Sequence, residues 1–246
     1  MITIEEALRY RPGKDFSEGH VFLLDKPLGW TSFNVVGKVK HALRHYLGQR
    51  VKVGHAGTLD PLATGLVVVC VGRATRLAGV LTAEDKAYEA TFTLGAKTAS
   101  YDLETPVEAG YPTEHITPEM IYQVAAKLTG QLSQRPPLFS AKRVDGKRAY
   151  QMARHGVEHE LDPVDITINS FEITEINANN TVKARISCSK GTYIRALARD
   201  FGEALGSAAY LSALRRTQSG QFLLDNAISI QELETFLKSI APQYAT

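Results

Sequence analysis

Residues 54–65, with the sequence GHAGTLDPLATG, carry the side chains best suited to catalysis in this chain. The segment lies between two apolar, strand-like runs and contains one carboxylate, Asp60, and one imidazole, His55. Pro61 biases Asp60 toward an extended backbone and so directs its carboxylate, and Gly57 permits a sharp turn. Loops on a rigid scaffold often carry catalytic residues. A tight turn between two strands explains the same residue types, so both interpretations stay open at this point.

A second informative stretch, residues 189–195 with the sequence SKGTYIR, lies between a predicted strand and a predicted helix. Lys190 near a helix N-terminus favours anions, and the guanidinium fork of Arg195 suits a carboxylate. Tyr88, at the start of a strand, and Leu214-Arg215-Arg216 are further candidates. A solvated basic loop, an aromatic on a sheet face and an exposed basic pair are the plain structural alternatives.

Hydrophobic periodicity and cap residues predict the elements that must position these side chains. Thr117-Pro118 and the Ser229-to-Glu232 capping box mark two helix starts. Strands are predicted at 20–26, 50–54, 66–72, 86–94, 138–144, 164–176, 181–189 and 213–222. Helices are predicted at 3–9, 31–47, 74–82, 117–130, 147–156, 192–205 and 229–239, and residues 97–117 are predicted to form a loop.

The helix expected at 31–47 has an apolar repeat that predicts one buried face. The residues of that face are Phe33, Val36, Val39, Leu43 and Leu47. His41 and His45 are four apart, as in helical zinc sites, but Ala42 follows the first of them and no third ligand is evident. We therefore expect ordinary surface histidines on a basic helix.

The mixture of helices and hairpins predicts an α+β fold with a central, largely antiparallel sheet flanked by helices. The chain has 246 residues, 44% of them hydrophobic, which is enough for a large core. No repeat and no linker divides it, so residues 1–246 are expected to form a single catalytic domain.

Composition sets only broad limits on function. The net charge is +2 and the pI is about 8.4, which neither requires nor excludes nucleic acid. Cys70 and Cys188 lie in apolar runs and are expected to be buried, reduced thiols rather than metal ligands. No secretory leader or membrane-length apolar run is visible, so we expect a cytoplasmic protein.

Taken together, ordered motifs spanning roughly residues 20–220 resemble the tRNA pseudouridine synthase B (TruB) family. Residues 22–32, FLLDKPLGWTS, are similar to the first family motif, and residues 54–65 to the catalytic loop. Residues 85–88, DKAY, resemble the tyrosine motif. Residues 189–195, followed by Leu214-Arg215-Arg216, resemble the arginine motif.

The resemblance implies isomerisation of uridine to pseudouridine in the T-arm stem-loop of tRNA, the activity of a tRNA pseudouridine(55) synthase. In the family, the residue matching Asp60 is catalytic, the one matching Tyr88 stacks on the target base, and the one matching Arg195 pairs with the aspartate. His55 then helps to hold the flipped-out loop, and Leu214 lines the pocket.

Further substrate-binding residues are expected within the same motifs, and they are Lys26, Gly57, Lys190, Tyr193 and Arg216. The resemblance implies no metal and no organic cofactor, and a monomer is the default expectation. Many family members carry an additional C-terminal RNA-binding domain of the PUA type. The residues after Phe222 are too few for a complete one, so none is expected here.

The chemistry agrees with these residue types. The target base must leave the folded loop to react, and a single carboxylate can act as nucleophile or base. The carboxylate pair of typical glycoside hydrolysis is not apparent in the loop. A non-catalytic RNA-folding protein is an alternative from another class. A nucleoside hydrolase is a third, weaker one.

Two clusters of basic residues support RNA contact, provided that the members of each share a face. A solvated surface is the plain alternative for each cluster. The first cluster consists of Lys38, Lys40, Arg44, Arg50 and Lys52, and the second of Lys142, Arg143, Lys147 and Arg148.

Overall fold

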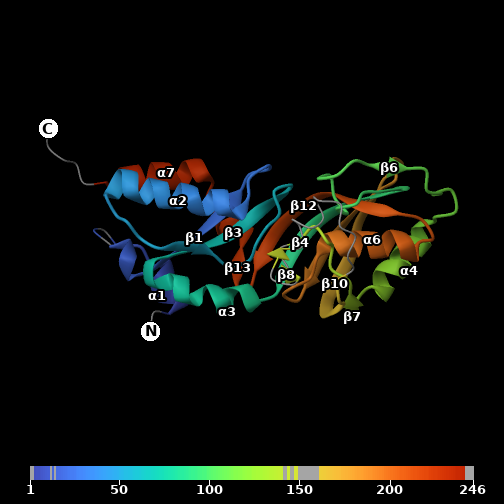
Figure 1. The fold of residues 1–246 in the computed structure, drawn as a ribbon, viewed down its shortest axis with the longest axis horizontal. Coiled ribbons are helices and arrows are strands. Elements are labelled where there is room, and N and C mark those ends of the chain that lie inside the picture. The colour runs from blue at the N-terminus through green and yellow to red at the C-terminus, as the bar shows by residue number, and fades with distance from the viewer. Residues whose placement is uncertain are drawn as a thin grey trace. The chain divides into compact units, whose positions relative to one another are not determined.

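The computed structural model describes residues 3–11, 13, 15–140, 143–144, 147–148 and 161–241. The chain forms two compact units (Figure 1). Unit 1 combines Met1–Lys86 with Arg215–Thr246, and unit 2 consists of Ala87–Leu214. A single catalytic domain therefore stays a prediction. Within the described ranges, no helix is long and apolar enough to cross a membrane.

The strands of unit 1 surround β3 (Ala63–Val71), which is buried almost throughout. β1 (His20–Lys26) pairs antiparallel with β3 along its whole length, ending with Lys26 opposite Gly65. β2 (Val53–His55) pairs antiparallel with the far end of β3. The β2–β3 connection is therefore the segment that carries Asp60, and both of its ends are anchored in the sheet.

Helices cover both faces of these strands (Figure 1). α2 (Ser32–Leu47) and α7 (Ile230–Ser239) lie on one side, and α1 (Ile4–Leu8) and α3 (Ala78–Ala83) on the other. A strand covered on both faces is apolar at successive positions, which explains the sequence LVVVCV in β3. Short segments complete the described part of the unit: η1 (Phe16–Glu18), η2 (Gly72–Leu77), β13 (Phe222–Leu223) and η3 (Leu224–Asn226).

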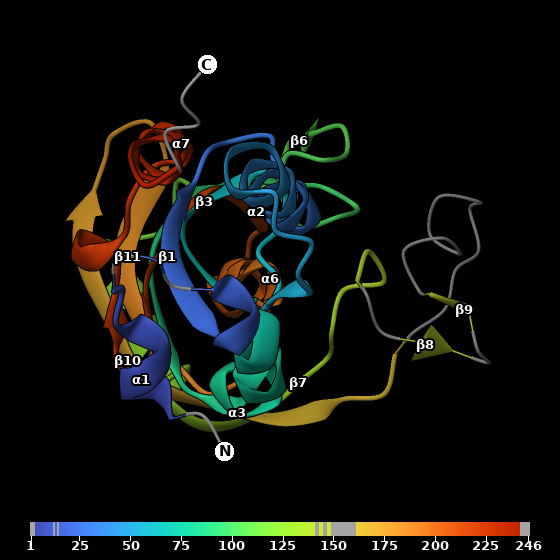
Figure 2. The same cartoon turned by 90° about the vertical axis from the view of Figure 1, so that its left-hand side faces the viewer.

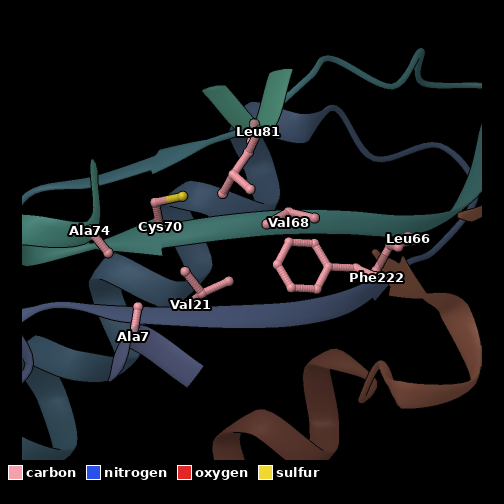
Figure 3. Packing of buried hydrophobic residues seen from close by; sticks show 9 residues of the cluster. Ala7, Val21, Leu66, Val68, Cys70, Ala74, Leu81 and Phe222 are labelled. Atoms are coloured by element: carbon pink, nitrogen blue, oxygen red, sulfur yellow. The ribbon is translucent and has the colours of Figure 1, made fainter. Parts of the chain in front are cut away.

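Alternate residues of β3 form the core toward α1 and α3. Figure 3 shows Leu66, Val68 and Cys70 gathered with Val21 and Phe222. Successive side chains of a strand point to opposite faces, so this set shares one face of β3. Burial raises the pKa of the Cys70 thiol to about 11. Both cysteines are buried and unpaired with each other, as the sequence predicts.

α2 begins and ends where its sequence directs. Thr31 accepts a hydrogen bond from the Asn34 amide, and the Asn34 side chain accepts one from the Thr31 amide. Gly48 ends the helix in the left-handed conformation, with a φ of 65°. The buried apolar residues are Val35, Val36, Val39, Ala42 and Leu43. The prediction of a buried Phe33 is wrong, because its side chain is 76% exposed.

Unit 2 contains a sheet in the order β12-β4-β11-β10-β7, formed with parts of β4 (Lys86–Leu94) and β12 (Ala209–Ser219). β10 (Val164–Ile176) and β11 (Thr181–Cys188) form the long hairpin that the sequence predicts (Figure 2). β7 (Gly130–Gln134) pairs antiparallel with β10. Together with the antiparallel pairs of unit 1, these pairs confirm the predicted α+β class.

The core of unit 2 holds α6 (Ile194–Ala204) against its sheet. Phe92 of β4, Phe171 of β10 and Phe201 of α6 have ring centroids 5.5 to 5.9 Å apart. A Cβ on Gly202 would lie only 2.2 Å from the Ala209 amide nitrogen, so α6 approaches β12 closely. This close packing gives α6 a fixed position in the unit.

The segments between these elements depart from the sequence expectations in part. The predicted loop at 97–117 includes β5 (Ala96–Lys97), which pairs with β6 (Glu108–Ala109) before α4 (Pro118–Lys127) begins. β8 (Arg143–Val144) pairs with β9 (Lys147–Arg148) on the two sides of the predicted turn. The predicted helix start at 147–148 is therefore wrong, and residues 149–156 lie outside the described residues.

Candidate active site

Asp60 lies in the β2–β3 connection, and the residue before it is fixed by a side chain of α2. Leu59 donates its amide hydrogen to Ser32 Oγ at 2.8 Å, and its carbonyl accepts a hydrogen bond from the same oxygen at 3.1 Å. Leu59 is 4% exposed and Ser32 is 2% exposed. The backbone carbonyl of Asp60 closes the turn by accepting a hydrogen bond from the Ala63 amide at 3.1 Å.

The residue after Asp60 is fixed by the segment that follows β1. The carbonyl of Pro61 accepts hydrogen bonds from the Gly29 amide at 2.9 Å and from Lys26 Nζ at 3.3 Å. Lys26 Nζ also donates to the Trp30 carbonyl at 2.6 Å. Both neighbours of Asp60 are thus hydrogen-bonded to residues 26–32, which limits the positions open to the carboxylate.

Lys26 is fully buried, and its ammonium belongs to the electrostatic environment of Asp60. Burial lowers the pKa of Lys26 to about 8, and the positive charge of Arg216 adds to this, while the negative charge of Asp60 acts in the opposite direction. The hydrogen bonds of Nζ to backbone carbonyls indicate a positioning role for Lys26. Direct substrate contact, expected from its motif, stays a prediction.

The depressed pKa of Lys26 makes stability depend on pH. The folded value, about 8, lies below the ordinary 10.5, so the unfolded chain binds more protons between these values. The contribution of Lys26 to the free energy of unfolding therefore rises as the pH rises from about 8 to 10.5. This contribution is lost as the pH falls back to 8.

Between pH 8 and 10.5, we expect the free energy of unfolding of wild type to rise relative to that of Lys26→Met. Urea unfolding at several pH values measures this difference. The matched control is Lys183→Met, which removes a half-exposed lysine of a surface ion pair. A difference between wild type and Lys26→Met that does not change with pH would contradict the assignment.

Arg216 of β12 supports the two ends of the catalytic loop from inside the unit. Its side chain is 1% exposed. Nε donates to the Leu66 carbonyl at 2.7 Å, and the terminal nitrogens donate to the carbonyls of Thr58 and Gly57 at 3.4 and 3.3 Å. Direct substrate contact, expected for Arg216 from its motif, requires an exposed guanidinium, so the structure favours a positioning role for this residue.

Two glycines permit this arrangement of the loop. Gly57 has a φ of 93°, a conformation that L side chains rarely adopt, and a Cβ there would lie 3.6 Å from an Arg216 nitrogen. Gly65 has a φ of 102°, and a Cβ there would lie 2.3 Å from the Arg216 carbonyl oxygen. The backbone conformation therefore requires a glycine at position 57, and the close contact with β12 requires one at position 65.

His55, the last residue of β2, has an unused polar atom. Its Nδ1 is buried and has no hydrogen-bond partner in the part of the chain that the structure describes. Burial lowers the pKa of His55, and the nearby charge of Arg216 lowers it further. Both effects favour the neutral imidazole.

The remaining candidates lie in unit 2. Tyr88 is on β4 and is 9% exposed. Tyr193, at the start of α6, exchanges hydrogen bonds with the Gln134 side chain at 2.9 and 3.1 Å. Lys190 is exposed and Leu214 is half-buried. Tyr88 and Leu214 thus lie within strands, whereas Lys190 and Tyr193 lie between β11 and α6, and the roles of all four stay predictions.

Arg195 is 4% exposed and is held by two carbonyls and a carboxylate of its own unit. Its terminal nitrogens donate to the carbonyls of Ser100 and Phe139, each at 3.0 Å. Nε lies 3.5 Å from Asp102 Oδ2, and Asp102 is 5% exposed. Asp102 is not predictable from the sequence, because it lies in a polar segment with several acids and nothing distinguishes it there.

Asp102 is itself fixed, which makes it a positioning residue for Arg195. Its Oδ1 accepts a hydrogen bond from the Glu104 amide at 2.9 Å, and its carbonyl accepts one from Thr98 Oγ1 at 2.6 Å. The preceding residue, Tyr101, has a φ of 62°, and its ring lies 4.9 Å from the Arg199 guanidinium. The Arg195 guanidinium is thus oriented by groups that are themselves immobilised.

We expect Asp102→Asn to lower kcat about 10- to 100-fold, because a shifted guanidinium misplaces the group that it orients. The substitution keeps the shape of the side chain and removes its charge. The measurement is single-turnover kinetics at saturating RNA. Glu175→Gln, which removes one partner of an exposed ion pair in the same unit, is the control and is expected to change nothing. Equal rates for the two variants would contradict the role of Asp102.

Comparison with known proteins identifies the family. Residues 44–194 match the model of the TruB family pseudouridylate synthase N-terminal domain, and residues 195–243 match the tRNA pseudouridylate synthase B C-terminal domain. The chain belongs to the TruB family of pseudouridylate synthases. The first match includes the loop around Asp60, and the boundary between the two matches falls next to Arg195.

Curated relatives of the TruB family match nearly the whole chain. The tRNA pseudouridine synthase B of Phocaeicola vulgatus is 48% identical over 224 residues, which are 91% of this chain and 95% of the relative. That of Bacteroides fragilis strain ATCC 25285 is 51% identical over 87% of this chain and 92% of the relative. The predicted resemblance is therefore confirmed.

Solved structures agree with the family. A chain of a Cbf5–Nop10–Gar1 complex matches with a TM-score of 0.67 and 32% identity. A chain of an H/ACA RNP bound to a substrate RNA containing 2′-deoxyuridine matches with a TM-score of 0.66 and 29% identity. The matches cover 88% and 90% of this chain but 54% of each of those chains, so this chain spans about half of their length.

The structure brings together one group of candidates within unit 1. That group is Lys26, His55, Gly57, Asp60 and Arg216. Unit 2 contains the others, which are Tyr88, Lys190, Tyr193, Arg195 and Leu214. Ser32 and Asp102 were not predicted as supporting residues. Ser32 is part of the quoted TruB motif, and its place in that motif was the available signal.

The predicted basic clusters are described in part. Lys40, Arg44, Arg50 and Lys52 are exposed. Lys38 instead forms an ion pair with Glu234 of α7, at 2.7 Å. The side chains of the second cluster lie outside the described residues, and they are Lys142, Arg143, Lys147 and Arg148.

Proposed function

We propose that the protein isomerises uridine to pseudouridine in the T-loop of tRNA, with Asp60 as the catalytic carboxylate. The observation that carries this proposal is the fixed position of Asp60. Ser32 holds Leu59 on one side of it, and Gly29 and Lys26 hold Pro61 on the other. Such a loop in a chain of the TruB family supports a preorganised catalytic carboxylate.

The reaction requires little besides a positioned carboxylate. The bond from the sugar C1′ to N1 of uracil breaks, the ring turns, and C1′ bonds to C5; C5 then loses its hydrogen as a proton, and N1 takes up a proton. Atoms and electrons balance within the substrate and one proton, so the chemistry calls for no redox partner. Asp60 serves as nucleophile or as base, and its restrained position suits either role.

Other residues of the site are proposed to bind and orient the flipped base. His55 is proposed to help hold the flipped-out loop, because its motif matches that of the family. Tyr88 is proposed to stack on the base, and Arg195 to pair with Asp60, because their motifs match those of the family. The substrate is proposed to be the T-arm stem-loop of tRNA, bound by a monomer in the cytoplasm.

The test uses a T-arm stem-loop labelled with tritium at uridine C5. We expect tritium release, together with pseudouridine at the target position, and no release from a stem-loop in which only another uridine is labelled. Binding of the RNA without tritium release would instead indicate a non-catalytic RNA-binding protein. Release of free uracil would indicate a hydrolase, and either outcome would overturn the proposal.

A further inference from the structure

The exposed side of α2 carries an aromatic residue that packing does not explain. Phe33 is 76% exposed, the most exposed of the large hydrophobic side chains in the described residues. Successive residues of a helix are about 100° apart, so Phe33 lies about 200° from the buried Val35. Phe33 therefore points away from the core of unit 1, and an exposed phenyl ring of this size indicates a binding surface.

Basic residues continue the line of Phe33 along the helix. These basic residues are Lys40 and Arg44, and Gly37 lies between them and Phe33. The successive spacings from Phe33 are four, three and four residues, which places all of these residues on one face of the helix. All of them are exposed, and the sequence of α2 contains no Asp or Glu. We call these residues the α2 strip: Phe33, Gly37, Lys40 and Arg44. Its charge suits a polyanion.

The α2 strip begins at the catalytic loop. Phe33 directly follows Ser32, the residue that holds the neighbour of Asp60. Leu28, a second exposed apolar residue at 64%, directly precedes Gly29, which holds Pro61. The chain neighbours of Phe33 and Leu28 thus form hydrogen bonds with the two residues that flank Asp60. A substrate bound at Asp60 therefore lies near this end of α2.

We propose that the α2 strip binds the substrate RNA, with Phe33 stacked on an unpaired base and with Lys40 and Arg44 on backbone phosphates. The inference rests on the proposed function and extends it to a defined contact surface. A phenyl ring stacks on any base without reading its sequence, and cations on a helix face neutralise phosphates. Gly37 leaves a gap between the two parts, and a Cβ there would meet nothing within 4 Å.

The first test separates stacking from charge. Affinity for a T-arm stem-loop is measured by fluorescence anisotropy at several salt concentrations. We expect Phe33→Ala to weaken binding about 5- to 100-fold and to leave the slope of log K against log salt unchanged. Lys40→Ala/Arg44→Ala is expected to reduce the slope of log K against log salt by about 2. Phe33→Trp is expected to retain binding.

Two matched controls come from the same unit. Lys38→Ala removes a cation of α2 that pairs with Glu234, away from the strip. Val80→Ala truncates an apolar side chain that is 60% exposed on α3. We expect both to bind like wild type. A loss of salt slope in Lys38→Ala equal to half of that in the double variant would overturn the phosphate contacts.

A charge insertion gives an independent test. Gly37→Glu places a carboxylate in the middle of the strip, where the side chain has open space, and is expected to weaken binding about 10-fold or more. Gly79→Glu adds the same charge on α3, again in open space, and is expected to have no effect. Equal affinities of the two variants would overturn the proposal.

The outcomes also separate this inference from the proposed function. If wild type forms pseudouridine and the strip variants bind RNA normally, the strip is wrong and the function stands. If wild type forms no pseudouridine on any T-arm substrate, the function itself fails. If Phe33→Ala changes the sedimentation coefficient and leaves RNA affinity intact, the strip contacts protein, and the proposal is overturned.

Discussion

Replacing Asp60 with asparagine is expected to lower the rate of pseudouridine formation by about 10³-fold or more. The amide keeps the size of the side chain but supplies neither a nucleophilic oxygen of comparable strength nor a base. Leu59 and Pro61 remain held by Ser32, Lys26 and the backbone, so the loop is expected to keep its shape. Single-turnover tritium release at saturating RNA measures the effect.

Asp225→Asn is the control for this prediction, because Asp225 is an exposed aspartate of the same unit. We expect it to react at the rate of wild type. RNA affinity of Asp60→Asn is expected to stay within a few-fold of wild type. Tritium release at more than a tenth of the wild-type rate would show that Asp60 is not the catalytic group.

Replacing Gly65 with alanine is expected to have the largest effect on folding. A Cβ at this position would lie 2.3 Å from the carbonyl oxygen of Arg216 and 2.7 Å from its amide nitrogen. The φ of 102° adds strain for any L residue. The atoms in the way belong to the backbone of the adjoining strand, so they cannot move to another rotamer as a side chain would. We therefore expect the free energy of unfolding to fall by about 3 kcal/mol or more.

Gly54→Ala is the matched control for this substitution. Gly54 lies at the other end of the same loop, and a Cβ there would meet nothing within 4 Å. Urea unfolding of the two variants and wild type gives the comparison. If Gly65→Ala proves as stable as Gly54→Ala, then β3 and β12 do not approach each other as closely as described.

The catalytic loop and its flanking elements were predictable because local rules govern them. The capping box at Thr31 and Asn34, and the one at Ser229 and Glu232, begin α2 and α7 through contacts within one turn. The bounds of β4 and β10 follow from alternation and apolar runs. Asp60 was recognisable because its loop motif is long.

The rest depended on contacts between residues far apart in the sequence. Apolar periodicity placed Phe33 in the core because it counts residue types, whereas the helix buries the face of Val35 and Ala42. Asp102 lies 93 residues from Arg195, and no local pattern connects them. Arg216 was expected among the substrate-binding residues because of its motif, whereas its guanidinium donates hydrogen bonds to backbone carbonyls inside the unit.

The path of the chain through unit 1 has a consequence for biosynthesis. The chain leaves this unit after Lys86 and returns only at Arg215. Arg216 supports the loop around Asp60, and Phe222 completes the core, so an emerging N-terminal segment lacks both. A ribosome must therefore translate past residue 222 before the catalytic loop acquires its support. A polypeptide that terminates early carries the full Asp60 motif without the residues that hold it in place.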